Sequence, residues 1–150
     1  MKNKGFSLVE LIIVIAIMAI LAAAIAPALI RYIDKSRKAD DVAAAETVNT
    51  AVNAALANED AYSECASESW FDSAAVVWSA NGGSTLNGTE AGAATTFGKE
   101  MMSNLGGEAP KVKYNKDKNT QWSVKLQESG KALVYKGSVE LQPDIDASYK

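Results

Sequence analysis

Residues 4–30 read KGFSLVELIIVIAIMAILAAAIAPALI, a long and almost entirely apolar sequence. From residue 6 to residue 30 the apolar run is interrupted by Ser7, Glu10 and Pro27. At about 1.5 Å of rise per residue, a helix of this length crosses the ~30 Å hydrocarbon layer of a membrane. A small soluble domain has no interior large enough to cover such a helix on all sides. The stretch therefore predicts a membrane-spanning helix.

Glu10 is a carboxylate near the start of this apolar run. A charged side chain at the centre of a membrane helix costs about 2.5 to 3.5 kcal/mol on insertion scales, and less toward an end. Two explanations remain open from the residues: the carboxylate has a partner that offsets this cost, or it extends to the lipid headgroups.

An ordinary cleaved secretory signal is the alternative interpretation of the N-terminus. Lys2 and Lys4 supply a basic start, and Ala24-Ile25-Ala26 has the small-x-small form of a cleavage site. Pro27 would then follow the cut directly, where its fixed φ and missing N–H fit a protease cleft poorly. The length of the run and the carboxylate inside it also argue against such a signal.

The charges that flank the apolar run give a conflicting indication of orientation. Two lysines precede it, whereas four basic residues follow it: Arg31, Lys35, Arg37 and Lys38. Counting positive charges alone places the body of the protein in the cytoplasm. Asp34, Asp40 and Asp41 dilute the second cluster, although acidic residues contribute little to this rule. Charge counting therefore leaves the topology open.

The composition excludes several classes of chemistry. The 150 residues include no histidine, which is the commonest general base and metal ligand, so catalytic triads and His-containing zinc sites are excluded. With one cysteine, Cys65, no intrachain disulfide can form. The 15 basic and 18 acidic residues make the chain mildly acidic, which argues against nucleic acid as a partner.

The helical pattern continues beyond the apolar run to about residue 60. Apolar residues recur at three- and four-residue steps: Val42, Ala45, Val48, Val52, Ala55 and Leu56. Polar residues are assigned to other faces: Asp41, Glu46, Asn49, Asn53 and Glu59. The pattern predicts an amphipathic continuation over residues 31–60, with one side that packs on a sheet.

The rest of the chain predicts a connection followed by a sheet. Residues 61–110 are rich in Ser, Gly, Asn and Thr, and we expect a connecting region anchored by the cluster at residues 70–78. Within it, Phe97, Met101 and Leu105 precede two glycines and predict a short helix. Residues 111–150 alternate with period two, which predicts three or four antiparallel strands, around residues 112–114, 122–126, 133–135 and 139–141. The fold class is therefore α+β.

One loop carries oxygen ligands at the spacing of the first part of a calcium loop: Asn115, Asp117 and Asn119. Thr120 stands where that loop needs glycine, and Leu126 where it needs the closing carboxylate. We therefore expect a polar hairpin there, with no metal and no cofactor.

Two positions are candidates for modification. Asn87-Gly88-Thr89 fits the acceptor pattern for N-linked sugar, although Asn-Gly also favours a plain turn. We expect Cys65 to be a partly buried thiol, and a link between two subunits is the alternative in an oxidising exterior.

The stretch Lys4-Gly5-Phe6-Ser7-Leu8-Val9-Glu10-Leu11 resembles the N-terminus of class III signal-peptide proteins, the type IV pilins and the pseudopilins of type II secretion systems. In that family a short basic leader that ends in glycine is removed, and the newly exposed phenylalanine is N-methylated. The resemblance implies that residues 1–5 are the leader, that cleavage falls between Gly5 and Phe6, and that Phe6 is methylated. Pro27 stands where the family usually has a helix-kinking proline. The likeness covers about the first 35 residues.

The resemblance also implies a function. It predicts a structural subunit, not an enzyme, that waits in the cytoplasmic membrane with its C-terminal body outside. Its partners would be the prepilin peptidase and methyltransferase, the pilus assembly platform, and copies of itself in a surface filament. In the family, the glutamate that corresponds to Glu10 pairs with the N-terminal amine of a neighbouring subunit, which here is the amine of Phe6. The alternatives are a pseudopilin of a secretion system and a single-pass anchored binding domain that does not polymerise.

Overall fold

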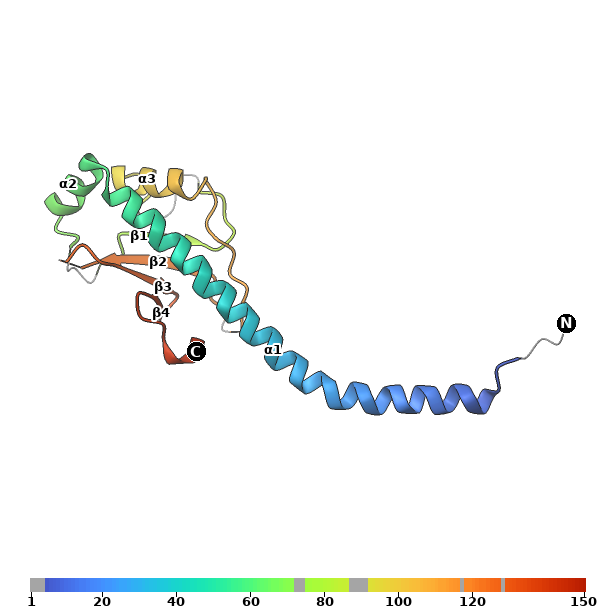
Figure 1. Cartoon of the computed structure of the whole chain (residues 1–150). Coiled ribbons are helices and arrows are strands. Elements are labelled where there is room, and N and C mark those ends of the chain that lie inside the picture. The colour runs from blue at the N-terminus through green and yellow to red at the C-terminus, as the bar shows by residue number, and fades with distance from the viewer. Residues whose placement is uncertain (1–4, 72–74, 87–91, 117, 128) are drawn as a thin grey trace. The chain divides into compact units, whose positions relative to one another are not determined.

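The computed structural model describes residues 5–71, 75–86, 92–116, 118–127 and 129–150. The chain divides into two compact units, Met1–Ser36 and Arg37–Lys150, and helix α1 (Leu8–Leu56) contributes to both. Figure 1 labels the elements along the chain. Because the units are separate bodies, each is described by itself.

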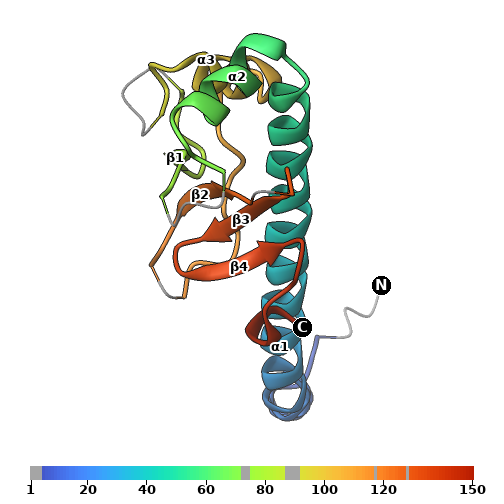
Figure 2. The same cartoon turned by 90° about the vertical axis from the view of Figure 1, so that its left-hand side faces the viewer.

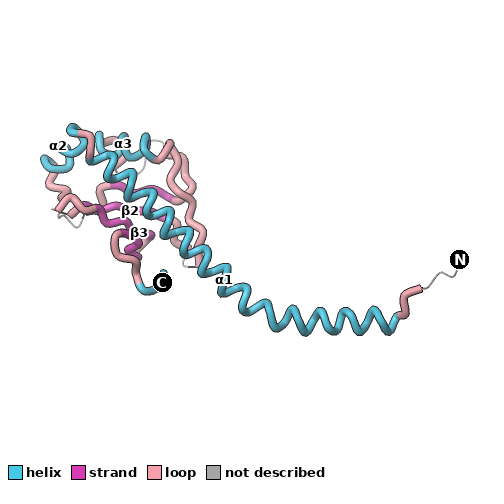
Figure 3. The backbone as a smooth tube through the Cα atoms, in the orientation of Figure 1, coloured by secondary structure: helices cyan, strands magenta, loops and turns pink. Residues whose placement is uncertain are grey.

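The described part of the first unit is the N-terminal part of α1 with the three residues before it. Every residue from 8 to 30 is exposed, although the segment is almost entirely apolar. In the described part of the chain, α1 is the helix that is long and apolar enough to cross a membrane. It continues through Pro27 (Figure 3), and the kink at that residue stays a prediction.

In the second unit, α1 buries one face against the sheet domain. The buried residues follow three- and four-residue steps along the helix: Asp41, Ala45, Val48, Ala51, Val52 and Ala55. This confirms the predicted apolar face. It also shows that the assignment of Asp41 to a solvent face was wrong, since its side chain is fully buried.

Two short helices follow the end of α1. The polypeptide leaves α1 after Leu56, and Asn58 begins α2 (Glu59–Ser67) by accepting hydrogen bonds from the N–H groups of the second and third residues after it. The predicted short helix is confirmed as α3 (Thr96–Asn104), which Thr95 caps in the same way. In Figures 1 and 2, α2 and α3 lie beside each other at the same end of the domain.

The sheet has four antiparallel strands in the order β1-β2-β3-β4. Their bounds are Trp78–Asn81 for β1, Gln121–Leu126 for β2, Ala132–Lys136 for β3 and Val139–Gln142 for β4. A 3₁₀ turn, η1 (Ala147–Tyr149), follows. Figure 2 shows the sheet beside the second half of α1. The predicted α+β class is confirmed.

The strand predicted around residues 112–114 is wrong. Those residues have no strand partner, because the N–H groups of Lys113 and Tyr114 donate instead to the Asp41 carboxylate. The fourth strand is β1, which comes from the region that was expected to be a connection. Trp78 of β1 pairs with Val124 of β2, and both side chains are fully buried.

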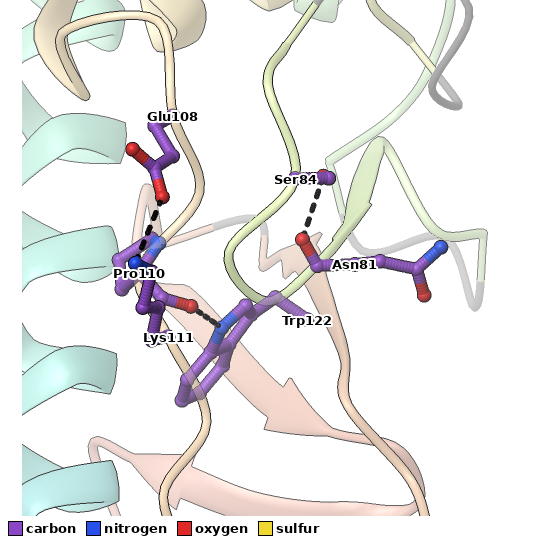
Figure 4. Close-up of polar contacts among 6 residues, drawn as sticks. All are labelled: Asn81, Ser84, Glu108, Pro110, Lys111 and Trp122. Atoms are coloured by element: carbon purple, nitrogen blue, oxygen red, sulfur yellow. Dashed lines mark hydrogen bonds and ion pairs between the residues drawn. The ribbon is translucent and has the colours of Figure 1, made fainter.

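A buried tryptophan bonds strand β2 to the segment that precedes this strand in the chain. The indole Nε1–H of Trp122 donates to the carbonyl of Pro110 at 2.8 Å (Figure 4). The same view shows the hydroxyl of Ser84 donating to the carbonyl of Asn81 at 2.7 Å, which closes the turn after β1. The Trp122 bond holds Pro110 on β2, three residues before Lys113, whose N–H donates to Asp41.

Candidate assembly site and its support

The predicted cleavage site lies in an open segment before α1. Gly5, Phe6 and Ser7 have no regular secondary structure. The side chain of Phe6 is 83% exposed, and no atom lies within 4 Å of the position that a Cβ on Gly5 would take. In the described residues, the chain at Gly5 and Phe6 is therefore exposed.

Glu10 is bonded to the start of its own helix. Its Oε2 accepts a hydrogen bond from the Ser7 N–H at 2.9 Å, while the Leu11 N–H donates to the Ser7 carbonyl at 3.2 Å. A serine followed three residues later by glutamate has the spacing of a capping box. A carboxylate in the first turn also interacts favourably with the helix macrodipole. Capping therefore offsets part of the free-energy cost of placing the Glu10 carboxylate in the apolar run. The sequence analysis missed this explanation, although the spacing Ser7-x-x-Glu10 indicates it.

The cap leaves the carboxylate with capacity for a second partner. An ionised carboxylate has two oxygens and about four lone-pair sites, and the Ser7 bond uses one of them. Phe6 directly precedes Ser7 and would have a free amine if the predicted leader, residues 1–5, were removed. The site can therefore combine a structural cap with a charge pair.

A second polar cluster supports the domain on α1, and Asp41 is its centre. The Asp41 carboxylate accepts hydrogen bonds from the N–H groups of Lys113, at 2.6 Å, and Tyr114, at 3.2 Å. The Tyr149 hydroxyl also bonds to Asp41. Lys136 Nζ donates to that hydroxyl at 2.7 Å. The cluster joins α1 to the segment before β2, to β3 and to the C-terminal turn.

The cluster places two unlike charges in the interior. Asp41 and Lys136 are each fully buried. Burial raises the pKa of Asp41 above its ordinary value of 3.8, although the two backbone N–H bonds and the Lys136 charge act in the opposite direction. The ammonium of Lys136 lies 5.5 Å from the ring centres of both Tyr114 and Tyr149, which stabilises the cation further.

A lysine closes the same cluster from the solvent side. Lys38 Nζ donates to the carbonyl of Ser148 at 2.6 Å and lies 5.1 Å from the Tyr114 ring centre. The last turn of the chain is thus bonded to α1 at two places, through Lys38 and through Asp41. The chain has no cysteine pair for a disulfide, so these contacts, and not a disulfide, hold the C-terminal turn on α1.

Cys65 should be unreactive in the folded protein. Its side chain is fully buried, and burial, together with the nearby Glu64 carboxylate, raises the pKa of the thiol to about 11 from an ordinary 9.0. At pH 8 this shift alone reduces the thiolate about 100-fold. We expect Ellman's reagent to label Cys65 rapidly in denaturant and at least 100-fold more slowly without it. Rapid labelling of the native chain would instead favour the alternative in which Cys65 links two subunits.

The other candidate sites receive no support as ligand sites. Asn119 Oδ1 accepts from the Gln121 N–H at 3.0 Å, and the Asn115 carbonyl accepts from the Lys118 N–H at 3.3 Å. Both contacts serve the local turn. Asp117 and Asn87 lie outside the described residues. Among the residues that the structure does describe, no group of three or more His, Cys, Asp or Glu is placed to hold a metal.

Comparisons with known proteins agree with this geometry. The family model described as "Prokaryotic N-terminal methylation motif" matches residues 1–26, which include the capped helix start. Together with the long helix and the four-stranded antiparallel sheet, this defines the class of pilin-like proteins with an N-terminal methylation motif.

The type IV major pilin protein PilA of Myxococcus xanthus (strain DK1622) is 36% identical to the chain over 70 residues, which are 47% of this chain and 32% of that protein. The chain thus matches about a third of the length of this relative. No solved structure matches the chain. The family model and this relative both support a relationship to the type IV pilins and pseudopilins. This family indicates a structural protein rather than an enzyme, and the exposed apolar helix is consistent with a membrane-anchored precursor.

Proposed function

We propose that the chain is the precursor subunit of a type IV pilus-like filament and that it polymerises through the first half of α1. One observation carries the proposal: an apolar helix segment is exposed along residues 8–30, while the second unit of the chain has a core of its own. An exposed apolar surface of this extent is unfavourable in water, so another apolar surface must cover it. Lipid covers it in the membrane, and identical helices from other subunits cover it in a filament.

Processing at Gly5 and Phe6 prepares the helix for assembly. Removal of residues 1–5 leaves Phe6 as the first residue, with a new α-amino group four residues before Glu10. In the filament, the Glu10 carboxylate of one subunit pairs with the Phe6 amine of a neighbour. Two groups that are costly alone in a low-dielectric core become tolerable when paired, and the pair fixes the axial register between subunits.

Before assembly, the subunit waits in the cytoplasmic membrane with residues 6–30 across the bilayer. Helix α1 continues to Leu56, residues 61–110 contribute strand β1 and helix α3, and residues 111–150 supply the other three strands of the domain on the outer side. The prepilin peptidase and methyltransferase acts on the cytoplasmic end, and an assembly platform moves the subunit from lipid into the filament. The likeness to a major pilin supports a pilus over a secretion pseudopilus.

The N-terminal peptide of the mature protein tests this function. We expect mass spectrometry of filaments sheared from cells to find this chain, with an N-terminal peptide that begins at N-methylated Phe6. A terminus at Met1, or one that follows Ala26, would contradict the proposed processing. A chain that is processed at Phe6 but never found in surface filaments would instead indicate a pseudopilin.

A further inference from the structure

Four residues of α1 surround a hollow just beyond the end of the apolar run. Ala28, Arg31, Tyr32 and Lys35 line this open space of about 310 Å³. Positions three, four and seven residues apart lie on one face of a helix, so these side chains form a single surface, which we call the basic face. All four belong to the first unit.

The basic face offers two positive charges beside an aromatic ring. Arg31, Tyr32 and Lys35 are all exposed, the tyrosine to 74%. In the described part of the chain, no ion pair includes Arg31 or Lys35. Ala28, with its small side chain, lines the hollow on the N-terminal side of the two cations.

The position of the basic face in the sequence indicates its partner. The apolar run ends at Ile30, so this turn of α1 reaches the headgroup level when residues 8–30 span the hydrocarbon layer. Tyrosine is enriched at that level because its ring is apolar and its hydroxyl is polar. A guanidinium presents a fork of donors that matches phosphate oxygens, and a lysine adds a point charge.

We propose that the basic face binds the phosphate headgroups of anionic phospholipids in the leaflet where the C-terminal end of the span emerges. Arg31 and Lys35 bind the phosphate oxygens across the hollow, and the ring of Tyr32 lies at the level of the headgroups. The inference rests on the membrane stage of the proposed function. It also gives the basic cluster after the span a purpose, although charge counting over that cluster argues against the proposed orientation with the body outside.

Lipid binding at this site would fix the depth of the waiting subunit without trapping it. Each lysine or arginine near an anionic surface contributes about a fivefold preference, so two give about 30-fold. Such a preference holds the helix at one depth in the bilayer. It is small enough to be overcome when the helix is extracted into a filament.

Native mass spectrometry of the full-length chain in detergent micelles tests the proposal. Phosphatidylglycerol and phosphatidylcholine are added in parallel, and the retained lipid is counted. We expect wild type to retain phosphatidylglycerol in preference to phosphatidylcholine. Arg31→Gln/Lys35→Gln should reduce this preference about 30-fold, whereas Arg31→Lys/Lys35→Arg should preserve it. Lys99→Gln/Lys131→Gln removes the same charge from two exposed positions of the second unit and should leave it unchanged.

Two results would overturn the proposal. One is equal retention of both lipids by wild type, and the other is an equal loss in the Lys99→Gln/Lys131→Gln control. The measurement uses unassembled subunits, so it does not depend on polymerisation. A chain that binds anionic lipid but never forms filaments would keep this inference and remove the proposed filament function.

Discussion

Replacing Glu10 with glutamine should abolish filaments while leaving the start of α1 folded. Glutamine satisfies the capping box as glutamate does, because its side-chain oxygen can accept the Ser7 N–H. It has no charge with which to pair the Phe6 amine of a neighbour. Removing one partner of a buried ion pair costs about 3 to 5 kcal/mol. Per subunit contact, this corresponds to a loss of more than about 100-fold in the association constant.

Glu10→Ala and Glu46→Gln complete the comparison. Alanine removes both the cap and the charge, so its filaments should be absent and its first helical turn should fray. Glu46 is an exposed glutamate on the same helix, and its replacement by glutamine should leave filaments at the wild-type level. Filaments are measured by shearing cells and quantifying the released subunit. If Glu10→Gln formed filaments normally, capping alone would explain the glutamate and the pairing between subunits would be wrong.

The helices and the late strands were predictable because their periodicity is local. The apolar steps from Val42 to Ala55 and the alternation in Trp122–Leu126 depend only on neighbouring residues. Residues 4–11 were informative in a different way, since the order and spacing of Gly5, Phe6 and Glu10 resemble the N-terminus of the pilin family, and the roles of these residues stay a prediction. These parts of the fold could be derived without any long-range contact.

The errors arose where a distant partner overrides the local pattern. Val112 and Tyr114 alternate like a strand, but the intervening backbone is bonded to Asp41, about 70 residues away in the chain. Asp41 itself lies four residues before Ala45, on the apolar face, and only its charge argued for solvent. A buried carboxylate requires a lysine and a tyrosine from the end of the chain, and no local pattern contains that information.

The Asp41 cluster should be the most sensitive part of the second unit. Asp41→Asn leaves Lys136 buried without this counter-charge, and Lys136→Met leaves the carboxylate buried without the cation. Each substitution should lower the free energy of unfolding by about 3 to 5 kcal/mol. The double variant should lose clearly less than the sum of the two, because neither charge is then left behind. Asp40→Asn changes the adjacent, exposed aspartate and should have little effect.

The pH dependence of stability in the same variants gives an independent measurement. The full chain is unfolded with urea in detergent, and the fluorescence of the buried Trp78 and Trp122 reports the unfolding. The pKa of Asp41 is raised in the folded protein, so between 3.8 and that raised value the folded state binds more protons than the unfolded state. The free energy of unfolding therefore falls as pH rises through this window. Above the raised pKa, Asp41 is ionised in the folded state and the loss is complete. Asp41→Asn should remove this component and Asp40→Asn should keep it. An identical pH profile for wild type and Asp41→Asn would mean that folding does not raise the pKa of Asp41.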